Sequence, residues 1–312
     1  MRYRTVGRSG LAVSEVGLGT SNFGIRVERR DAHSIIGAAL DLGVTLFDTA
    51  DVYGGGHCEE ILAESLGKRR KDVVIATKWG ADAAGLPSDA RGGSRSYILK
   101  AVEQSLRRLA TDYIDLYQMH VPDPRTPIEE TLMTLDSLVR QGKARYIGVS
   151  NMPAWQIVEA QLIAQQLGVH RFVSFQARYN LLTREIESTT FPATDRYGLG
   201  LLPTLPLAEG LLTGKYRQDS PVPEGTRLAN LSLMKERSVT EAKWKVLERL
   251  RQFAQERGHT LLELAMSWLI SRRQVCSIIA GASRTEQLVE NVAATGWRLS
   301  TEELLAIDEL TV

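Results

Sequence analysis

Cysteine is scarce in this sequence, and long apolar runs are absent from it. The 312 residues include only two cysteines, Cys58 and Cys276, which lie far apart in the chain. A disulfide framework or a cysteine zinc site needs more cysteines at closer spacing, so we expect neither, and no other metal site is indicated. No uncharged apolar run approaches the ~18 residues of a membrane span, and the N-terminus has no apolar signal core. We therefore expect a cytoplasmic protein that does not enter a membrane.

An excess of either charge is also absent. Lysine and arginine total 38 and aspartate and glutamate total 37, which leaves a formal net charge of +1. A protein that binds nucleic acid needs positive charge to neutralise phosphates, so nucleic acid is not an expected partner. Apolar residues make up 43% of the chain and charged residues 24%, which is typical of a globular protein.

Short apolar runs alternate with amphipathic stretches along most of the chain. About eight runs have the composition of buried strands: residues 16–19, 44–47, 73–76, 113–117, 146–149, 172–175, 199–202 and 277–280. Strands that alternate with helices form a parallel sheet, and eight of them can close into a barrel. We predict one α/β domain over residues 1–312, a (β/α)8 TIM barrel. A β-hairpin formed by residues 2–5 and 11–13 precedes the barrel and caps it.

Helix ends are marked in several of the intervening stretches. Asp31 is the expected N-cap of a helix that buries Ile35 and Ile36 and stops at Gly43. Ser94 is the expected N-cap of the helix that contains Val102.

A doubly wound nucleotide-binding sheet is the competing architecture. It requires Gly-x-Gly-x-x-Gly after the first strand, and the segment that begins at Gly17 and Gly19 has Asn22 in place of the third glycine. A phosphate-binding loop near Gly210 fails as well, because its glycines are one residue too close and Tyr216 follows Lys215. The barrel is the better prediction.

Four polar side chains follow three consecutive predicted strands. Asp48 and Tyr53 follow the second strand, Lys78 the third and His120 the fourth. The carboxyl ends of barrel strands form one mouth, so these groups should meet there. A lysine beside a tyrosine stabilises the phenolate and lowers the pKa of the phenol, and a neutral histidine can donate a hydrogen bond to a carbonyl oxygen. The set can therefore protonate a C=O group, but a cofactor must supply the hydride.

Three motifs resemble the signatures of the aldo-keto reductase superfamily. They are Phe47-Asp48-Thr49-Ala50-Asp51-Val52-Tyr53-Gly54, Asp115-Leu116-Tyr117-Gln118-Met119-His120 and Gly148-Val149-Ser150-Asn151. The resemblance runs from the N-terminal hairpin to Asn291 and so covers nearly the whole chain. It implies a barrel that binds NADP(H), with Tyr53 as general acid, Lys78 and Asp48 as the pair that tunes its pKa, and His120 as the residue that orients the carbonyl.

The resemblance also implies a set of cofactor contacts. Ser150, Asn151 and Gln176 match the positions that hold the nicotinamide carboxamide, and their groups can donate and accept hydrogen bonds. The segment that contains Leu207, Gly210 and Lys215 resembles the one whose backbone follows the pyrophosphate. The adenosine site is expected at the start of a late helix, where a helix N-terminus and an arginine suit a 2′-phosphate: Gly281, Ser283, Arg284, Gln287, Glu290 and Asn291.

The sequence departs from the family pattern at two places. Thr204 and Leu205 stand where the family has an aromatic residue and a serine, so the ring that stacks on the nicotinamide is absent there. Gly281 stands where some members have a lysine for the 2′-phosphate. NADPH preference then rests on Arg284, and the use of NADH stays open.

The substrate pocket is expected to include Val52 and Trp79, and the loops 81–93 and 217–238 should complete it. Loops of this kind set the substrate, so the sequence names only a small-molecule carbonyl compound. Two functions remain. The first is NADPH-dependent reduction of an aldehyde or ketone. The alternative is a cofactor-binding regulatory subunit, because the potassium-channel β subunits share this barrel.

Overall fold

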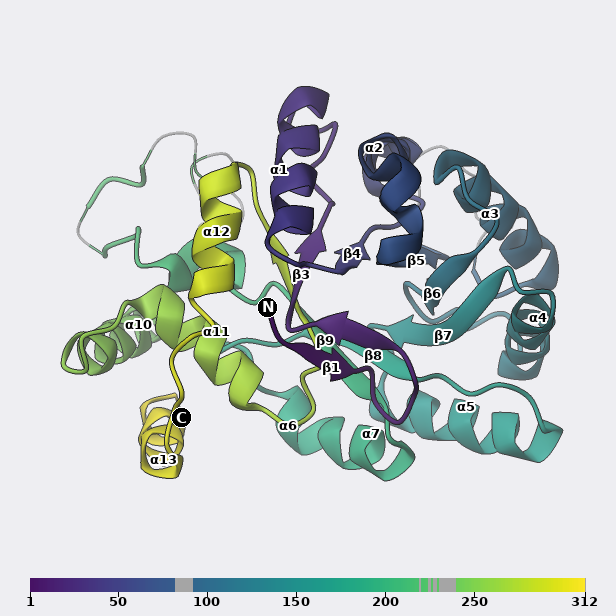
Figure 1. Cartoon of the computed structure of the whole chain (residues 1–312). Coiled ribbons are helices and arrows are strands. Elements are labelled where there is room, and N and C mark those ends of the chain that lie inside the picture. The colour runs from purple at the N-terminus through teal and green to yellow at the C-terminus, as the bar shows by residue number, and fades with distance from the viewer. Residues whose placement is uncertain (82–91, 219, 224–225, 227–228, 230–239, 312) are drawn as a thin grey trace.

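The computed structural model describes residues 1–81, 92–218, 220–223, 226, 229 and 240–311 (Figure 1). Most of the expected pocket loops, 81–93 and 217–238, lies outside the described residues. Among the described residues, no helix has the length and apolar character to span a bilayer.

Eight parallel strands form a nearly closed barrel, in the order β10-β3-β4-β5-β6-β7-β8-β9. A parallel bridge between Leu201 of β9 and Val275, in the segment just before β10, brings the two ends of this order together. Each predicted strand is present, with bounds shifted by a few residues, so the prediction of a (β/α)8 barrel is confirmed. The strands are β3 (Val16–Gly19), β4 (Leu46–Asp48), β5 (Val74–Trp79), β6 (Ile114–Met119), β7 (Ala144–Ser150), β8 (Ser174–Arg178), β9 (Gly200–Thr204) and β10 (Ile278–Gly281).

Helices surround the barrel on its outside (Figure 1). The longer ones have an apolar face that packs on the strands, as their sequence period predicts. They are α1 (Arg29–Asp41), α2 (His57–Leu66), α3 (Arg95–Arg108), α4 (Ile128–Arg140), α5 (Ala154–Leu167), α6 (Ile186–Thr189), α7 (Phe191–Tyr197), α10 (Glu241–Gln255), α11 (Leu261–Ser271), α12 (Thr285–Ala293) and α13 (Thr301–Leu310).

The predicted start of α1 is wrong. Glu28 occupies the N-cap position, and Asp31 lies in the first turn, where its negative charge still suits the helix dipole. Ser94 does occupy the N-cap of α3, although its side chain makes no capping hydrogen bond.

An N-terminal hairpin closes the amino end of the barrel. Its strands are β1 (Tyr3–Thr5) and β2 (Ala12–Ser14), which confirms the predicted hairpin. Val6, Leu11 and Val13 are buried in one cluster with apolar side chains from β4, β5, β6, β9 and β10. Because this cluster fills the amino end of the barrel, a site is expected at the carboxyl ends of the strands.

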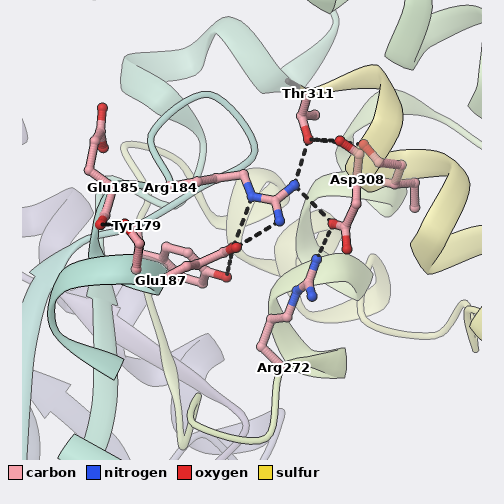
Figure 2. A network of polar contacts seen from close by, with 9 residues as sticks. Tyr179, Arg184, Glu185, Glu187, Arg272, Asp308 and Thr311 are labelled. Atoms are coloured by element: carbon pink, nitrogen blue, oxygen red, sulfur yellow. Dashed lines mark hydrogen bonds and ion pairs between the residues drawn. The ribbon is translucent and has the colours of Figure 1, made fainter. Parts of the chain in front are cut away.

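A network of polar contacts holds the C-terminal helix α13 against the segment that follows β8 (Figure 2). Arg184 donates to Glu187, with Nη2 2.7 Å from Oε2, and lies 2.9 Å from Asp308 of α13. The hydroxyl of Tyr179 donates to Glu187 over 2.6 Å, and Arg272 donates to Asp308 over 2.6 Å. Since Tyr179 comes directly after β8, this network fixes the carboxyl end of that strand.

The packing of the hairpin against the barrel can be tested at Gly7. Its φ is +56°, and a Cβ there would overlap the Gly198 carbonyl oxygen and come within 2.6 Å of the Gly200 nitrogen. We expect Gly7→Ala to lower the free energy of unfolding by roughly 3 kcal/mol. The matched control is Gly37→Ala in α1, where the new methyl group meets nothing within 4 Å. This substitution should raise the free energy of unfolding by roughly 0.5–1 kcal/mol. Chemical denaturation of both variants checks this, and equal effects would contradict it.

Candidate active site

A buried ion pair lies at the carboxyl ends of β4 and β5. Lys78 is 1% exposed, and its Nζ donates to Asp48 Oδ2 over 2.8 Å and to the Thr49 carbonyl oxygen over 2.7 Å. Gln176 from β8 donates to the other carboxylate oxygen of Asp48 over 2.9 Å. The sequence predicted the pair, whereas the hydrogen bond from Lys78 to the Thr49 carbonyl and the one from Gln176 to Asp48 were not predicted.

The electrostatic balance at Lys78 keeps it charged. Burial lowers the pKa of the ammonium group, but the charge of Asp48 raises it, and the pKa ends above its ordinary value. A permanent positive charge is therefore held inside the barrel mouth, where little water screens it.

Tyr53 lies beside this charge. Lys78 Nζ is 5.1 Å from the centre of the Tyr53 ring. Burial raises the pKa of the phenol above 10.0, and the charge and hydrogen bonding of Lys78 lower it by less. The expectation of a lowered pKa is therefore wrong for this structure, because burial outweighs the ammonium group. The phenol keeps its proton at neutral pH, so it is available as a proton donor.

His120 follows β6 and faces Tyr53 edge to face, with 5.7 Å between the ring centres. Burial and the charge of Lys78 lower the pKa of the imidazole to about 3. The ring is therefore neutral at physiological pH. Its Nδ1 is buried and has no hydrogen-bond partner among the described residues. A neutral imidazole here can donate one hydrogen bond to a ligand without adding charge.

The residues predicted to hold the nicotinamide lie at the ends of neighbouring strands. Ser150 of β7 pairs in register with Gln176 of β8, and both are buried. Asn151 has a φ of +54°, and its amide donates to the His120 carbonyl oxygen over 3.1 Å and to Ser150 Oγ over 3.0 Å. These amide and hydroxyl groups thus contact the Asp48 carboxylate and the backbone of His120.

Strained backbone gathers in the segment that follows β9. Leu205, Ala208 and Glu209 have φ values of +51°, +47° and +60°, although none is glycine. Strain of this kind is typical of ligand-binding segments, where the surrounding structure must hold it. Leu207 and Gly210 lie in this segment, and Lys215 follows it. The predicted pyrophosphate segment is therefore the most strained non-glycine stretch of the described chain.

The predicted adenosine residues surround the start of α12. Arg284 occupies the N-cap of this helix and is exposed, and Gly281 ends β10. Ser283 donates from its backbone nitrogen to Gln287 Oε1 over 2.8 Å and from its hydroxyl over 2.9 Å. Farther along the helix, Glu290 is exposed and Asn291 is buried. A helix N-terminus with an exposed arginine has the charge that a phosphate group requires.

The two predicted pocket residues differ in exposure. Val52 is half-buried next to Tyr53. Trp79 is fully buried, and its ring lies on Tyr117 with 4.4 Å between the centres. Its contact with a substrate stays a prediction. Within the described residues, no group of three or more histidine, cysteine or acidic side chains could hold a metal ion.

Sequence reasoning missed three charged residues behind the site. Asp51 lies within the first family motif but was given no role in the site, and Glu59 and Arg108 were given none either. Glu59 is fully buried in α2 and bonded to Arg108 of α3. The signal in the sequence was an acidic residue among the apolar positions of α2.

The barrel and its site define an oxidoreductase that uses a nicotinamide cofactor. Residues 15–312 match the model of the aldo/keto reductase family, and the chain belongs to this family. It is 39% identical to a probable voltage-gated potassium channel subunit beta of Oryza sativa subsp. japonica, over 94% of this chain and 91% of the relative. It is 37% identical to the L-glyceraldehyde 3-phosphate reductase of Escherichia coli strain K12, over 99% and 92% of the two chains. The uncharacterized oxidoreductase YrpG of Bacillus subtilis is 36% identical, over 99% and 96%.

Proposed function

We propose that this protein reduces an aldehyde or ketone to an alcohol with NADPH, and that Tyr53 supplies the proton. The observation that carries the proposal is the protonated Tyr53 phenol next to the buried Lys78 ammonium group, which Asp48 holds in place. A small aldehyde substrate is supported by the similarity to the L-glyceraldehyde 3-phosphate reductase.

The side chains divide the chemistry among them. Neutral His120 donates a hydrogen bond to the carbonyl oxygen and orients it toward Tyr53. Tyr53 gives its proton to that oxygen, and the positive charge of Lys78 stabilises the phenolate that results. When bound, the reduced nicotinamide supplies hydride to the carbonyl carbon. Val52 and Trp79 would form part of the wall that positions the substrate.

The residues present fit the cofactor. Ser150, Asn151 and Gln176 would hold the carboxamide of the nicotinamide, since their amides and hydroxyl lie at the ends of β7 and β8 beside His120 and Asp48. The strained segment after β9 would follow the pyrophosphate, and the N-terminus of α12 with Arg284 would take the 2′-phosphate. These placements favour NADPH over NADH.

A second candidate function is a cofactor-binding regulatory subunit. The similarity to the probable potassium channel subunit beta of Oryza sativa supports it. Such a subunit would bind the same cofactor, so a binding measurement cannot separate the two functions. Turnover can.

The proton donor is tested by Tyr53→Phe, which removes only the hydroxyl. We expect kcat for reduction of a panel of small aldehydes to fall by roughly 10²–10⁴-fold, since an acid catalyst contributes about that much. NADPH binding, followed by quenching of protein fluorescence, should stay within about twofold of the wild type, because the ring remains in place.

Two results would contradict this account. Equal rates for the variant and the wild type would remove Tyr53 as the donor. A wild type that binds NADPH but reduces no member of the panel would favour the regulatory subunit.

The cofactor preference is tested by Arg284→Ala. We expect the Kd for NADPH to rise by on the order of 10–100-fold, because a charged hydrogen bond to the phosphate is lost, while the Kd for NADH changes by less than about twofold. Arg273→Ala is the matched control, since Arg273 is an exposed arginine that pairs with Asp195. Titration calorimetry with both nucleotides gives the ratio. An unchanged ratio in Arg284→Ala would exclude this role.

A further inference from the structure

A fully buried carboxylate lies directly behind the strand that carries Lys78. Glu59 of α2 accepts a hydrogen bond from Thr77 Oγ1 over 2.6 Å, and Thr77 precedes Lys78 on β5. The other oxygen of Glu59 accepts from Arg108 Nε over 2.7 Å. Burial of such an ion pair is costly unless both charges are well bonded, as they are here. Glu59 thus joins α2 and α3 to the strand of the catalytic lysine.

Arg108 also packs on the turn that carries Tyr53. Tyr53 is followed by Gly54, Gly55 and Gly56, whose φ values are +58°, +66° and +103°. A Cβ at Gly56 would lie 2.6 Å from Arg108 Cδ and 2.8 Å from its Nε. The guanidinium group therefore lies against the glycine turn, so one ion pair contacts both the strand of Lys78 and the turn of Tyr53.

A second acidic side chain, Asp51, lies between Asp48 and Tyr53 in the sequence and interacts electrostatically with the same ion pair. Its backbone nitrogen donates to the Lys78 carbonyl oxygen over 3.1 Å. Its Oδ1 is buried without a hydrogen-bond partner among the described residues. Burial, and to a smaller extent the charge of Glu59, raise the pKa of Asp51 to about 7, although the charges of Arg108 and Lys78 lower it.

Charged and titratable groups from four packed elements interact electrostatically with Asp51. Glu59 comes from α2, Arg108 from α3, Lys78 from β5 and Tyr117 from β6. The hydroxyl of Tyr117 is also buried without a partner in the described part of the chain, and burial together with the charges of Asp51 and Glu59 holds its pKa well above 10. At neutral pH Tyr117 is therefore uncharged, whereas Asp51, with a pKa of about 7, changes its charge in this pH range.

We propose that Asp51, Glu59 and Arg108 form a positioning cluster that fixes Tyr53 relative to Lys78 and makes carbonyl reduction depend on the protonation of Asp51. The inference rests on the proposed function. With Asp51 protonated, Arg108 neutralises Glu59 alone and stays on the glycine turn. When Asp51 loses its proton, two carboxylates compete for one guanidinium group, and an extra negative charge stands next to the Lys78 strand. The rate of reduction should therefore be highest below the pKa of Asp51 and should fall as the pH rises through that value. This value is the inflection of the pH–rate profile.

Asp51→Asn tests the proposal, because asparagine has the shape of the protonated acid and cannot ionise. For the wild type we expect kcat/KM to fall by roughly fivefold between pH 7 and pH 8. In Asp51→Asn this fall should disappear, and the rate at pH 8 should match the wild-type rate at low pH. The matched control is Asp41→Asn, whose carboxylate is 83% exposed and outside the cluster, and which should keep the wild-type profile.

Two further variants shift the inflection in opposite directions. Glu59→Gln removes a negative charge and frees Arg108, so the inflection should move to lower pH. Arg108→Gln removes a positive charge, so it should move to higher pH. If the cluster served only to hold the fold, these two substitutions would change the rate of reduction but would leave the inflection at the same pH.

Stability gives a readout that needs no turnover. Because the folded pKa of Asp51 lies above its unfolded value of 3.8, the folded state binds more protons between pH 3.8 and about 7. Its contribution to stability is therefore lost as the pH rises through this window. The unfolding temperature of the wild type should decline relative to that of Asp51→Asn over the same range.

The possible failures are distinct. A wild type that reduces no carbonyl compound would remove the proposed function and, with it, the link from the cluster to reduction. Reduction with the same inflection in wild type and Asp51→Asn would overturn this inference alone. So would parallel unfolding temperatures for the two proteins from pH 4 to pH 8.

Discussion

The site depends on the ion pair between Lys78 and Asp48. Moving an ammonium group out of water costs several kcal/mol unless its partners replace the lost hydration. Here the carboxylate of Asp48 and the carbonyl of Thr49 supply those partners, and Gln176 fixes the other side of the carboxylate. Because the pair is satisfied, its charge can act on Tyr53 and His120, and it contributes to keeping the imidazole neutral.

The fold keeps this pair buried at the carboxyl end of the barrel. The N-terminal hairpin fills the amino end of the barrel, so the polar side chains at the carboxyl ends of β4, β5 and β6 are left facing the same mouth. The strained segment after β9 and the start of α12 belong to that same end. Stability and chemistry are thus assigned to opposite ends of the strands, as is general for this architecture.

Much of this could be predicted from the sequence, because strand runs and strand-end positions are local patterns. The barrel, the hairpin and the approach of Lys78 to Asp48 follow from them. The start of α1 could not be fixed, because Glu28 and Asp31 are both acceptable near a helix N-terminus. The raised pKa of Tyr53 and the environment of Asp51 were missed for another reason. Both depend on the depth of burial and on charges that reach them from other helices and strands, which no local pattern records.

A double-mutant cycle on Asp48 and Lys78 tests the central claim most directly, with unfolding free energy and kcat measured on the same samples. Asp48→Asn should cost roughly 3–5 kcal/mol of stability, because Lys78 is left buried without its counterion, and should lower kcat by at least about 100-fold. Adding Lys78→Met should restore most of the stability and none of the activity, since the charge itself is then gone. If Asp48→Asn alone kept the stability and kcat of the wild type, the ion pair would not support the site.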